Sequence, residues 1–184
     1  MIEGAQEALD DPDHPVTSIY KEEYAYKTLK FREAMTEGNA VFYQPPNPIK
    51  CGGAPLKITF LSESRWRDLG RRNNINVLFY TALPVMFPPC LKFSVALNTI
   101  REEKGFPVFF KHQLKSVDKN TKTCVFEHLD TKVQTKVEYD FLHLVPPHTA
   151  PDFIAKSPLV NPGSSFIPVD RETLQHLKYP NVFG

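Results

Sequence analysis

The sequence has few cysteines, a single tryptophan, no excess of either charge and no long apolar run. Its 184 residues include three cysteines, and 22 lysines and arginines stand against 21 aspartates and glutamates. The balanced charge gives no reason to expect nucleic acid or an anionic membrane as a partner. No 18 apolar residues run together, so no transmembrane helix is predicted.

The cysteine spacing excludes two further classes of protein. Cys51, Cys90 and Cys124 are separated by 39 and 34 residues, which fits neither a zinc-binding pattern nor a secreted disulfide framework. We therefore expect free thiols in a reducing compartment and no metal site. The opening "MIEGAQEALDDPDHP" is acidic, whereas a signal peptide or mitochondrial presequence would be apolar or basic, so no targeting segment is predicted.

Hydrophobic periodicity predicts alternating helices and strands along the chain. Apolar residues recur every three or four positions in 20–36, 55–72 and 91–104, which predicts three helices. Short apolar runs predict buried strands in "AVFYQP", ending near Tyr43, in "INVLFYTA" and in "FLHLV". Alternating residues predict antiparallel strands in "PVFFKH", "LKSVD", "TCVFEHL" and "TKVEYD". This order predicts an α/β fold, a Rossmann-like parallel sheet with helices and an inserted antiparallel β flap.

The loop after the first strand lacks the features of a dinucleotide site. It reads "QPPNPIKCGGAP", where a G-x-G-x-x-G motif would cradle a pyrophosphate against the helix N-terminus. After the second strand, "TALP" offers no acidic side chain for an adenosine ribose. The domain is therefore predicted not to bind a nicotinamide dinucleotide, which disfavours an NAD-dependent disulfide reductase.

The same loop places a thiol at the start of a helix. Helix N-termini favour anions such as a thiolate, and Gly52 and Gly53 leave the approach to Cys51 free of side chains. A flat cofactor or a small nucleophile could then contact the sulfur. The alternative is that Cys51 is a small apolar residue filling a turn. Its position favours the redox role only slightly.

Several stretches resemble one enzyme family. "EGNAVF", "IKCGGAPLKITFLSE", "YDFLHLVPPHTAPDFIAKSPLV" and "VDRETLQHLKYPNVFG" resemble the central portion of sulfide:quinone oxidoreductases, in the branch found in animal mitochondria. These are flavoproteins with two dinucleotide-binding folds, of which one binds FAD. "CGGAP" matches the Cys-x-Gly-Ala-Pro motif of the first redox cysteine, so the resemblance makes Cys51 catalytic and implies that Gly52 and Gly53 allow close approach of the flavin.

The resemblance also implies the arrangement of a longer protein. Residues 1–37 would form a helical segment that belongs to or leads from the FAD domain. Residues 38–145 would form an NADH-domain-like Rossmann domain with the flap, and 146–184 a proline-rich return segment toward the FAD domain. The main FAD-binding motifs and the second redox cysteine have no counterpart in this sequence, so we expect a fragment that is inactive alone.

The family's reaction sets further expectations. Hydrogen sulfide is oxidised to a protein persulfide, two electrons pass through FAD to ubiquinone, and the sulfur leaves on a small acceptor such as glutathione or sulfite. The location implied is the mitochondrial inner membrane, with membrane contact through C-terminal elements that this chain does not contain. The alternative from another class is a catalytically inactive Rossmann-like binding module.

Four other features have structural interpretations. Cys90 in "MFPPCLK" is expected to begin a helix, and Cys124 to lie in the core or on the surface of an alternating strand. His143 in the apolar "FLHLV" is expected to be a hydrogen-bonded core residue. The arginines of "RWRDLGRR" are expected to form a solvated helix end rather than a nucleic-acid patch.

Overall fold

The computed structural model describes residues 2–184. Contacts within the chain divide it into two units, one ending at Pro146 and one comprising Pro147–Gly184. The first unit contains nearly all of the regular structure, whereas the second contains one short helix, α5 (Asp152–Ala155). Among these residues, no helix combines the length and the apolar character needed to cross a membrane.

The first unit is built on a five-stranded parallel sheet. Its strand order is β1-β8-β2-β3-β4, and every neighbouring pair is parallel. The strands are β1 (Val16–Thr17), β2 (Gly38–Gln44), β3 (Ile75–Thr81), β4 (Val108–Phe109) and β8 (Phe141–Leu144). A second, antiparallel sheet has the order β5-β6-β7, formed by β5 (His112–Asp118), β6 (Thr123–His128) and β7 (Gln134–Glu138).

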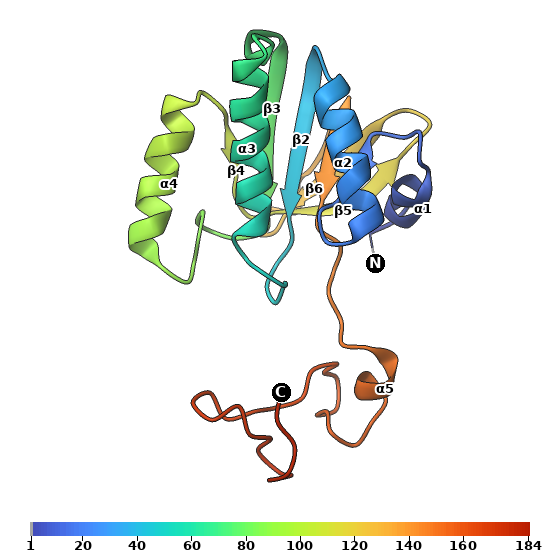
Figure 1. Ribbon diagram of the computed structural model, residues 1–184, viewed down its shortest axis with the longest axis vertical. Helices are drawn as coiled ribbons and strands as arrows, with labels where there is room; N and C mark the ends of the chain where they lie inside the picture. Colours follow the sequence, from blue (N-terminus) through green and yellow to red (C-terminus); the bar gives the residue numbers. More distant parts are fainter. Residues whose placement is uncertain (1) are drawn as a thin grey trace. The chain divides into compact units, whose positions relative to one another are not determined.

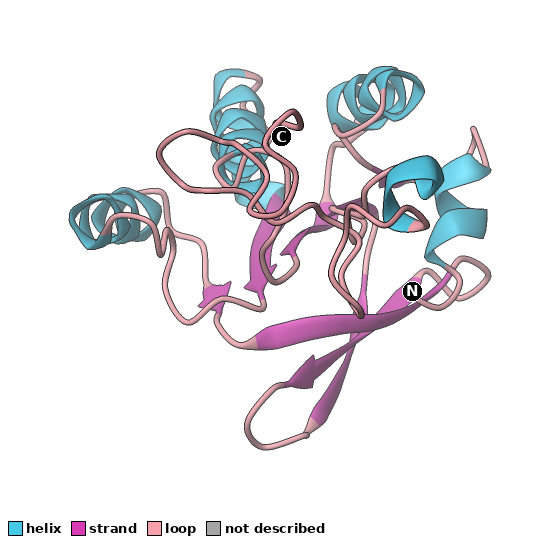
Figure 2. Cartoon of the chain, turned by 90° about the horizontal axis from the view of Figure 1, so that it is seen from below, coloured by secondary structure: helices cyan, strands magenta, loops and turns pink. Residues whose placement is uncertain are grey.

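Helices cover one face of the parallel sheet and the antiparallel sheet covers the other (Figures 1 and 2). The helices on that face are α2 (Glu22–Ala34), α3 (Ala54–Asp68) and α4 (Leu91–Glu103), with a short 3₁₀ turn at Arg72–Asn74. The remaining helix of this unit, α1 (Ala5–Asp10), packs with the antiparallel sheet. On the helix side, Phe42, Trp66 and Phe141 pack together in one core cluster. On the other side, Tyr80 stacks on Phe126 of the antiparallel sheet at 3.9 Å between ring centroids. Because both faces are buried, the central strands are almost wholly apolar.

The predicted fold class is confirmed, and its elements lie within a few residues of the predicted ranges. The first predicted helix is α2, and the strand expected to end near Tyr43 ends at Gln44. Gly38, the glycine of "EGNAVF", lies beyond Met35, the C-cap residue of α2. It begins β2 with φ 100°, where an added Cβ would lie 2.0 Å from Oδ2 of Asp140. Only glycine fits that close approach.

The prediction that "PVFFKH" forms an antiparallel strand was wrong. Val108 and Phe109 form β4, which pairs in parallel with Phe79 and Tyr80 of β3. The antiparallel sheet begins after Lys111, whose φ of 54° turns the chain. The apolar residues of the short edge strand β4 are followed almost at once by the alternating residues of β5. The sequence pattern therefore shows no boundary between the two strands.

The N-terminal residues contribute more to this unit than the sequence indicated. β1 pairs with β8, α1 packs into the core cluster on the side of the antiparallel sheet, and Glu3 bridges to Ser116 of β5. Neither α1 nor β1 was predicted, since each is too short to show a period. The first unit therefore includes residues on both sides of the expected boundary after residue 37.

The second unit consists mostly of loops held by local hydrogen bonds. Two isolated β-bridges, between Val169 and His176 and between Gln175 and Phe183, join its loop segments. The His176 Nδ1 accepts hydrogen bonds from the N–H groups of Lys178 and Tyr179, so its Nε2 donates to the Leu159 carbonyl at 2.7 Å. This buried histidine fixes the loops around it.

His143 of β8 is buried as predicted, but the predicted hydrogen bonds are absent. Its side chain is fully buried beside Phe42, at 6.0 Å between ring centroids. Neither ring nitrogen has a hydrogen-bond partner among the described residues. Burial lowers the pKa of His143 to about 3, so the imidazole is neutral in the folded protein.

This histidine should make the fold sensitive to acid. Unfolded, it titrates near its ordinary pKa of about 6.5, so below that pH the unfolded chain binds the extra proton and stability is lost down to about pH 3. Between neutral pH and about pH 4.5 this group alone should remove about 2.5 kcal/mol from the free energy of unfolding. Urea unfolding followed by the fluorescence of Trp66 measures the free energy of unfolding at each pH. Between neutral pH and about pH 4.5, the His143→Leu variant should lose about 2.5 kcal/mol less stability than the unaltered chain. Equal losses in the two proteins would contradict the assignment.

Candidate functional site

The loop that follows β2 carries Cys51. It connects the end of β2 at Gln44 to the start of α3 at Ala54. Cys51 is exposed and its thiol is free, so the predicted position in a surface loop before a helix is confirmed.

Cys51 has an unusual backbone conformation. Its φ of 50° lies in the left-handed region, which residues with a Cβ seldom adopt. Such a conformation costs on the order of 1–3 kcal/mol and persists only where neighbouring contacts hold it. The Cys51 carbonyl accepts a hydrogen bond from the N–H of Ala54 at 2.9 Å and another from the Tyr20 hydroxyl at 3.1 Å.

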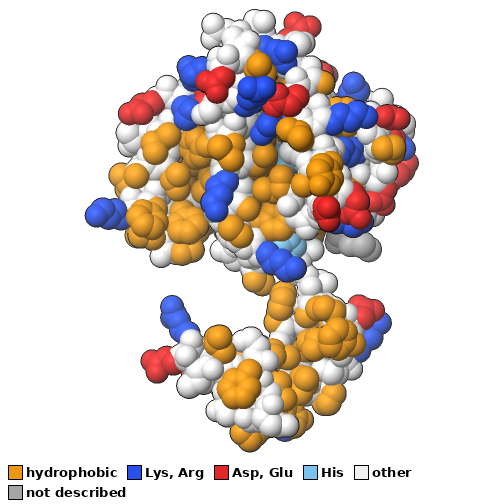
Figure 3. Space-filling model, viewed as in Figure 1, with side chains coloured by type: hydrophobic (Ala, Val, Ile, Leu, Met, Phe, Trp, Pro, Cys, Tyr) orange, Lys and Arg blue, Asp and Glu red, His pale blue; other side chains and the backbone are white. Residues whose placement is uncertain are grey.

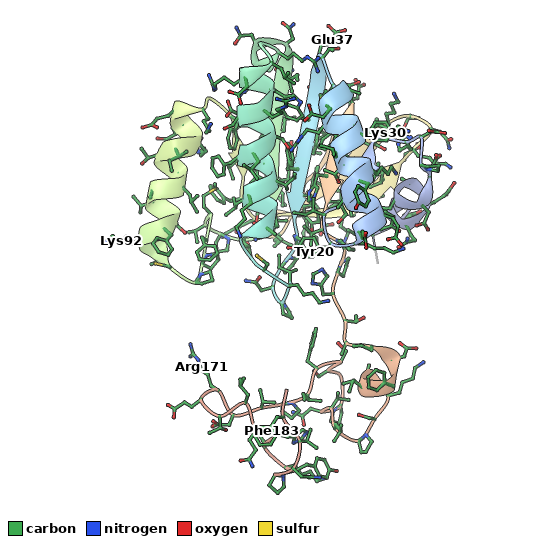
Figure 4. All side chains as sticks on the ribbon, in the orientation of Figure 1. Tyr20, Lys30, Glu37, Lys92, Arg171 and Phe183 are labelled. Carbon is green, nitrogen blue, oxygen red and sulfur yellow. The ribbon has the colours of Figure 1, made fainter. Side chains whose placement is uncertain are left out.

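Tyr20 and Gln44 hold the loop from two directions. Tyr20 precedes α2 and lies near the end of that helix in Figure 4, 31 residues before Cys51 in the sequence. Burial, together with the nearby Cys51, raises the pKa of Tyr20 to about 12, so at neutral pH its hydroxyl remains a donor. Gln44 donates from Nε2 to the Gly52 carbonyl at 3.0 Å. The residue that carries the thiol and the residue after it are therefore both fixed through their carbonyl groups.

Sequence reasoning identified the cysteine but missed both residues that hold it. No pattern connects Tyr20 with Cys51, because their contact depends on how α2 packs beside α3. Gln44 did leave a signal, since it is a polar residue at the end of an otherwise apolar strand. Its side chain is 1% exposed, and its Oε1 has no hydrogen-bond partner among residues 2–184.

The surroundings of the two glycines are open, as the sequence predicted. A Cβ added to Gly52 would meet no atom within 4 Å, and one added to Gly53 would meet only the Phe87 ring at 3.9 Å. A cavity of about 310 Å³ lies beside the loop, lined by Gln44, Asn47, Gly52, Phe87 and neighbouring apolar residues. Nothing among residues 2–184 requires glycine at either position, so any requirement would come from a molecule that approaches the loop.

The other two cysteines differ from Cys51 in position and exposure. Cys90 is half-buried and is the N-cap residue of α4, as predicted. Cys124 is fully buried on β6, and burial raises the pKa of its thiol to about 12. Neither is as exposed as Cys51. Among the described residues, no three histidine, cysteine or acidic side chains lie together in a way that could hold a metal ion.

Removing the Tyr20 hydroxyl should release the strained loop. We expect Tyr20→Phe to change the rate at which iodoacetamide alkylates Cys51 by about 3-fold or more, since a hydrogen bond of about 1 kcal/mol to the Cys51 carbonyl is lost. The alkylation rate of Cys90 should stay the same, which separates a local effect from general loosening. Mass spectrometry of each cysteine-containing peptide gives both rates. An unchanged Cys51 rate would show that the hydrogen bond does not position the loop.

The fold is that of a class of oxidoreductases with Rossmann-like domains. The solved sulfide:quinone oxidoreductase of Aquifex aeolicus superposes with a TM-score of 0.81, at 19% identity, over 100% of this chain and 42% of that chain. At this level of identity the likeness shows the fold alone. No protein-family model matches the chain.

Two curated relatives are much more similar in sequence. The mitochondrial sulfide:quinone oxidoreductase of Mus musculus is 41% identical over 184 residues, and that of Schizosaccharomyces pombe is 40% identical over 185 residues. Both matches cover this whole chain and 40% of the relative. The resemblance seen in the sequence is confirmed. This chain is similar over its whole length to one part of these two enzymes, and it spans about 40% of their length.

Proposed function

We propose that this chain is the part of a sulfide:quinone oxidoreductase that carries the first redox cysteine, Cys51. The single observation that carries the proposal is the 41% identity with the mouse enzyme over the entire chain. The exposed thiol in a loop held by Tyr20 and Gln44 agrees with a sulfur that reacts with other molecules. The proposed location is the mitochondrial inner membrane.

In the proposed reaction, Cys51 forms a disulfide with a second cysteine of the complete protein. Hydrosulfide attacks that second sulfur, the S–S bond breaks, and Cys51 leaves as a thiolate while the other cysteine holds a persulfide. A small thiol such as glutathione, or sulfite, then removes the outer sulfur. The two cysteine thiolates rejoin as a disulfide and release two electrons, so each cycle oxidises one sulfide by two electrons.

The loop around Cys51 fits the approach of a flat redox group. Gly52 and Gly53 present no side chain, the cavity beside them is open, and Gln44 has a buried acceptor oxygen without a partner. Bound FAD would accept the two electrons and pass them to ubiquinone. The role of this chain is to hold Cys51 in one orientation and to leave its sulfur accessible.

Replacing the matching segment of the mouse enzyme with this chain tests the proposal. We call the resulting protein the chimera. It should bind FAD, as its visible absorbance will show, and should reduce a ubiquinone analogue only when sulfide is supplied. A chimera that binds FAD and never reduces quinone would favour the alternative, an inactive binding module. The unaltered mouse enzyme, measured in parallel, controls for the assay.

A further inference from the structure

Gln44 is a buried polar residue at the end of an apolar strand. Its backbone is fixed in the sheet, since its carbonyl accepts a hydrogen bond from the N–H of Ala82, just beyond β3, at 3.0 Å. Its side chain is 1% exposed and reaches into the loop of Cys51, where Nε2 donates to the Gly52 carbonyl at 3.0 Å. Because this chain alone buries Gln44 and supplies both partners of the bond, the arrangement does not depend on what a longer protein would place against the loop.

The carboxamide of Gln44 does little for the stability of the fold. The bond to the Gly52 carbonyl shows which end of the amide is the nitrogen, and the other end, Oε1, has no partner among the described residues. A buried acceptor without a partner costs about as much free energy as one hydrogen bond returns, or more. An apolar side chain of the same shape would therefore serve the fold at least as well. What the carboxamide does provide is a fixed position for Gly52, the residue that follows Cys51.

The peptide group between Gly52 and Gly53 depends on this bond for its orientation. A Cβ added to Gly52 would meet no atom within 4 Å, and Gln44 is the one described residue that donates to the Gly52 carbonyl. In a planar trans peptide the N–H points opposite to the carbonyl, so the Gly53 N–H faces away from the buried Gln44. Gly53 is the N-cap residue of α3. If the peptide turned over, a carbonyl oxygen would take the place of that N–H at the start of the helix.

The direction of this carbonyl matters for the charge around Cys51. No aspartate or glutamate occurs in residues 38–62, and Figure 3 shows no acidic side chain where β2 ends in Figure 1, at the lower edge of the first unit. Within the loop, the negative partial charge that could turn toward the sulfur is therefore that of a backbone carbonyl oxygen. A carbonyl oxygen beside the sulfur disfavours a thiolate, whereas the N–H groups at a helix N-terminus favour it.

We infer that Gln44 is a positioning residue for the sulfur chemistry at Cys51. It keeps the Gly52 carbonyl turned inward and leaves the Gly53 N–H on the outer side of the loop, where the Cys51 thiol is exposed. In this role Gln44 contacts neither the sulfur nor a substrate and acts through the backbone of the loop. The inference rests on the proposed function, in which Cys51 leaves as a thiolate.

Replacing Gln44 with Met tests the inference, because methionine keeps the length of the side chain and removes both polar atoms. In the chimera, kcat for sulfide-dependent quinone reduction should fall about 5-fold or more, since one hydrogen bond of ordinary strength is lost, while the KM for quinone and the bound flavin stay the same. In the 184-residue chain, iodoacetamide should alkylate Cys51 at least about 3-fold more slowly, with the rate at Cys90 unchanged. The urea midpoint, followed by Trp66 fluorescence, should be unchanged or higher.

Gln44→Glu supplies a rescue that a merely structural role would not show. The two side chains have the same shape, but a carboxyl group can donate to the Gly52 carbonyl only when it is protonated. Because burial raises the pKa of a carboxyl group, this variant should gain at least about 5-fold in activity, relative to the unaltered chimera, as the pH falls from about 8 to about 6.

Gln113→Met on β5 is the matched control, since it makes the same chemical change at a half-buried residue of the other sheet. It should leave the activity and both alkylation rates as they are. An unchanged Cys51 rate in Gln44→Met would overturn the inference, whether or not the chimera reduces quinone, and the unaltered chimera tests the proposed function separately. A lower urea midpoint with equally faster alkylation of Cys51 and Cys90 would also overturn it, because Gln44 would then only stabilise the fold.

Discussion

Changing Cys51 to Ser in the chimera should lower sulfide-dependent quinone reduction by a factor of about a thousand or more, roughly 4 kcal/mol of activation free energy. Serine nearly matches cysteine in shape, but it cannot form the disulfide that sulfide attacks and supplies no accessible anion at neutral pH. The step is removed, so no residual rate through this route is expected. FAD should remain bound, because Cys51 makes no contribution to the main cofactor-binding motifs.

The other two cysteines supply matched controls for this prediction. Cys90→Ser should keep nearly full activity, and Cys124→Ser should cost on the order of 1 kcal/mol of stability because its thiol is fully buried. Quinone reduction is followed by absorbance, and the flavin spectrum of each variant reports folding. If Cys51→Ser keeps a tenth of the activity with flavin bound, or if Cys90→Ser is the inactive variant, the chemistry belongs to another sulfur.

The sequence was sufficient to predict the central strands of the parallel sheet, because strands that are buried on both faces are apolar at most positions. "AVFYQP" and "INVLFYTA" are mostly apolar, and the strands that contain them, β2 and β3, pair in register from Gly38 with Ile75 to Gln44 with Thr81. The Cys51 loop was predictable for a related reason, since prolines and glycines interrupt both neighbouring patterns. Local sequence therefore determined the elements and the position of the thiol.

Contacts between distant segments could not be predicted in this way. The hydrogen bond from Tyr20 to Cys51 and the pairing of β1 with β8 both join residues that the sheet order brings together. The arginines of "RWRDLGRR" show the same limit. Arg65 and Arg67, in the last turn of α3, are 45% and 54% exposed, as expected of a solvated helix end. Arg71 and Arg72 differ, because Arg71 donates to the carbonyls of Glu33 and Met35 and Arg72 to those of Ile75, Lys104 and Gly105.

Average composition concealed the distribution of charge. A net charge of +1 suggests an even mixture of charges, yet no aspartate or glutamate occurs in residues 38–62 or 69–101. Net charge describes the whole chain, whereas binding depends on the charges within about a Debye length, roughly 8–10 Å, of a surface. The helical period of α4 has a similar limit, because it does not show which side of the helix the rest of the fold covers.

One buried carboxylate explains why the end of α3 departs from the sequence-based expectation. Glu63 has a fully buried side chain and receives hydrogen bonds from Lys104 at 2.6 Å, from Arg72 at 3.3 Å and from Arg67. Burial raises the pKa of Glu63, but the bonds from Lys104 and Arg67 outweigh it and hold the pKa below its ordinary value. The carboxylate is thus ionised at neutral pH and joins α3 to the end of α4 and to the turn before β3.

Replacing Glu63 with Gln should cost about 3 kcal/mol of unfolding free energy, because it leaves the surrounding cations partly buried without their counter-charge. Glu33→Gln is the matched control. Glu33 also pairs with two arginines, Arg32 and Arg65, but its side chain is 32% exposed, so its loss should cost less than about 1 kcal/mol. Urea unfolding followed by Trp66 fluorescence measures both. Since a lowered carboxyl pKa gives stability that is lost as the pH falls through it, the difference between the unaltered chain and Glu63→Gln should shrink in acid. If Glu63→Gln costs no more than Glu33→Gln, the buried carboxylate does not hold α3 in place.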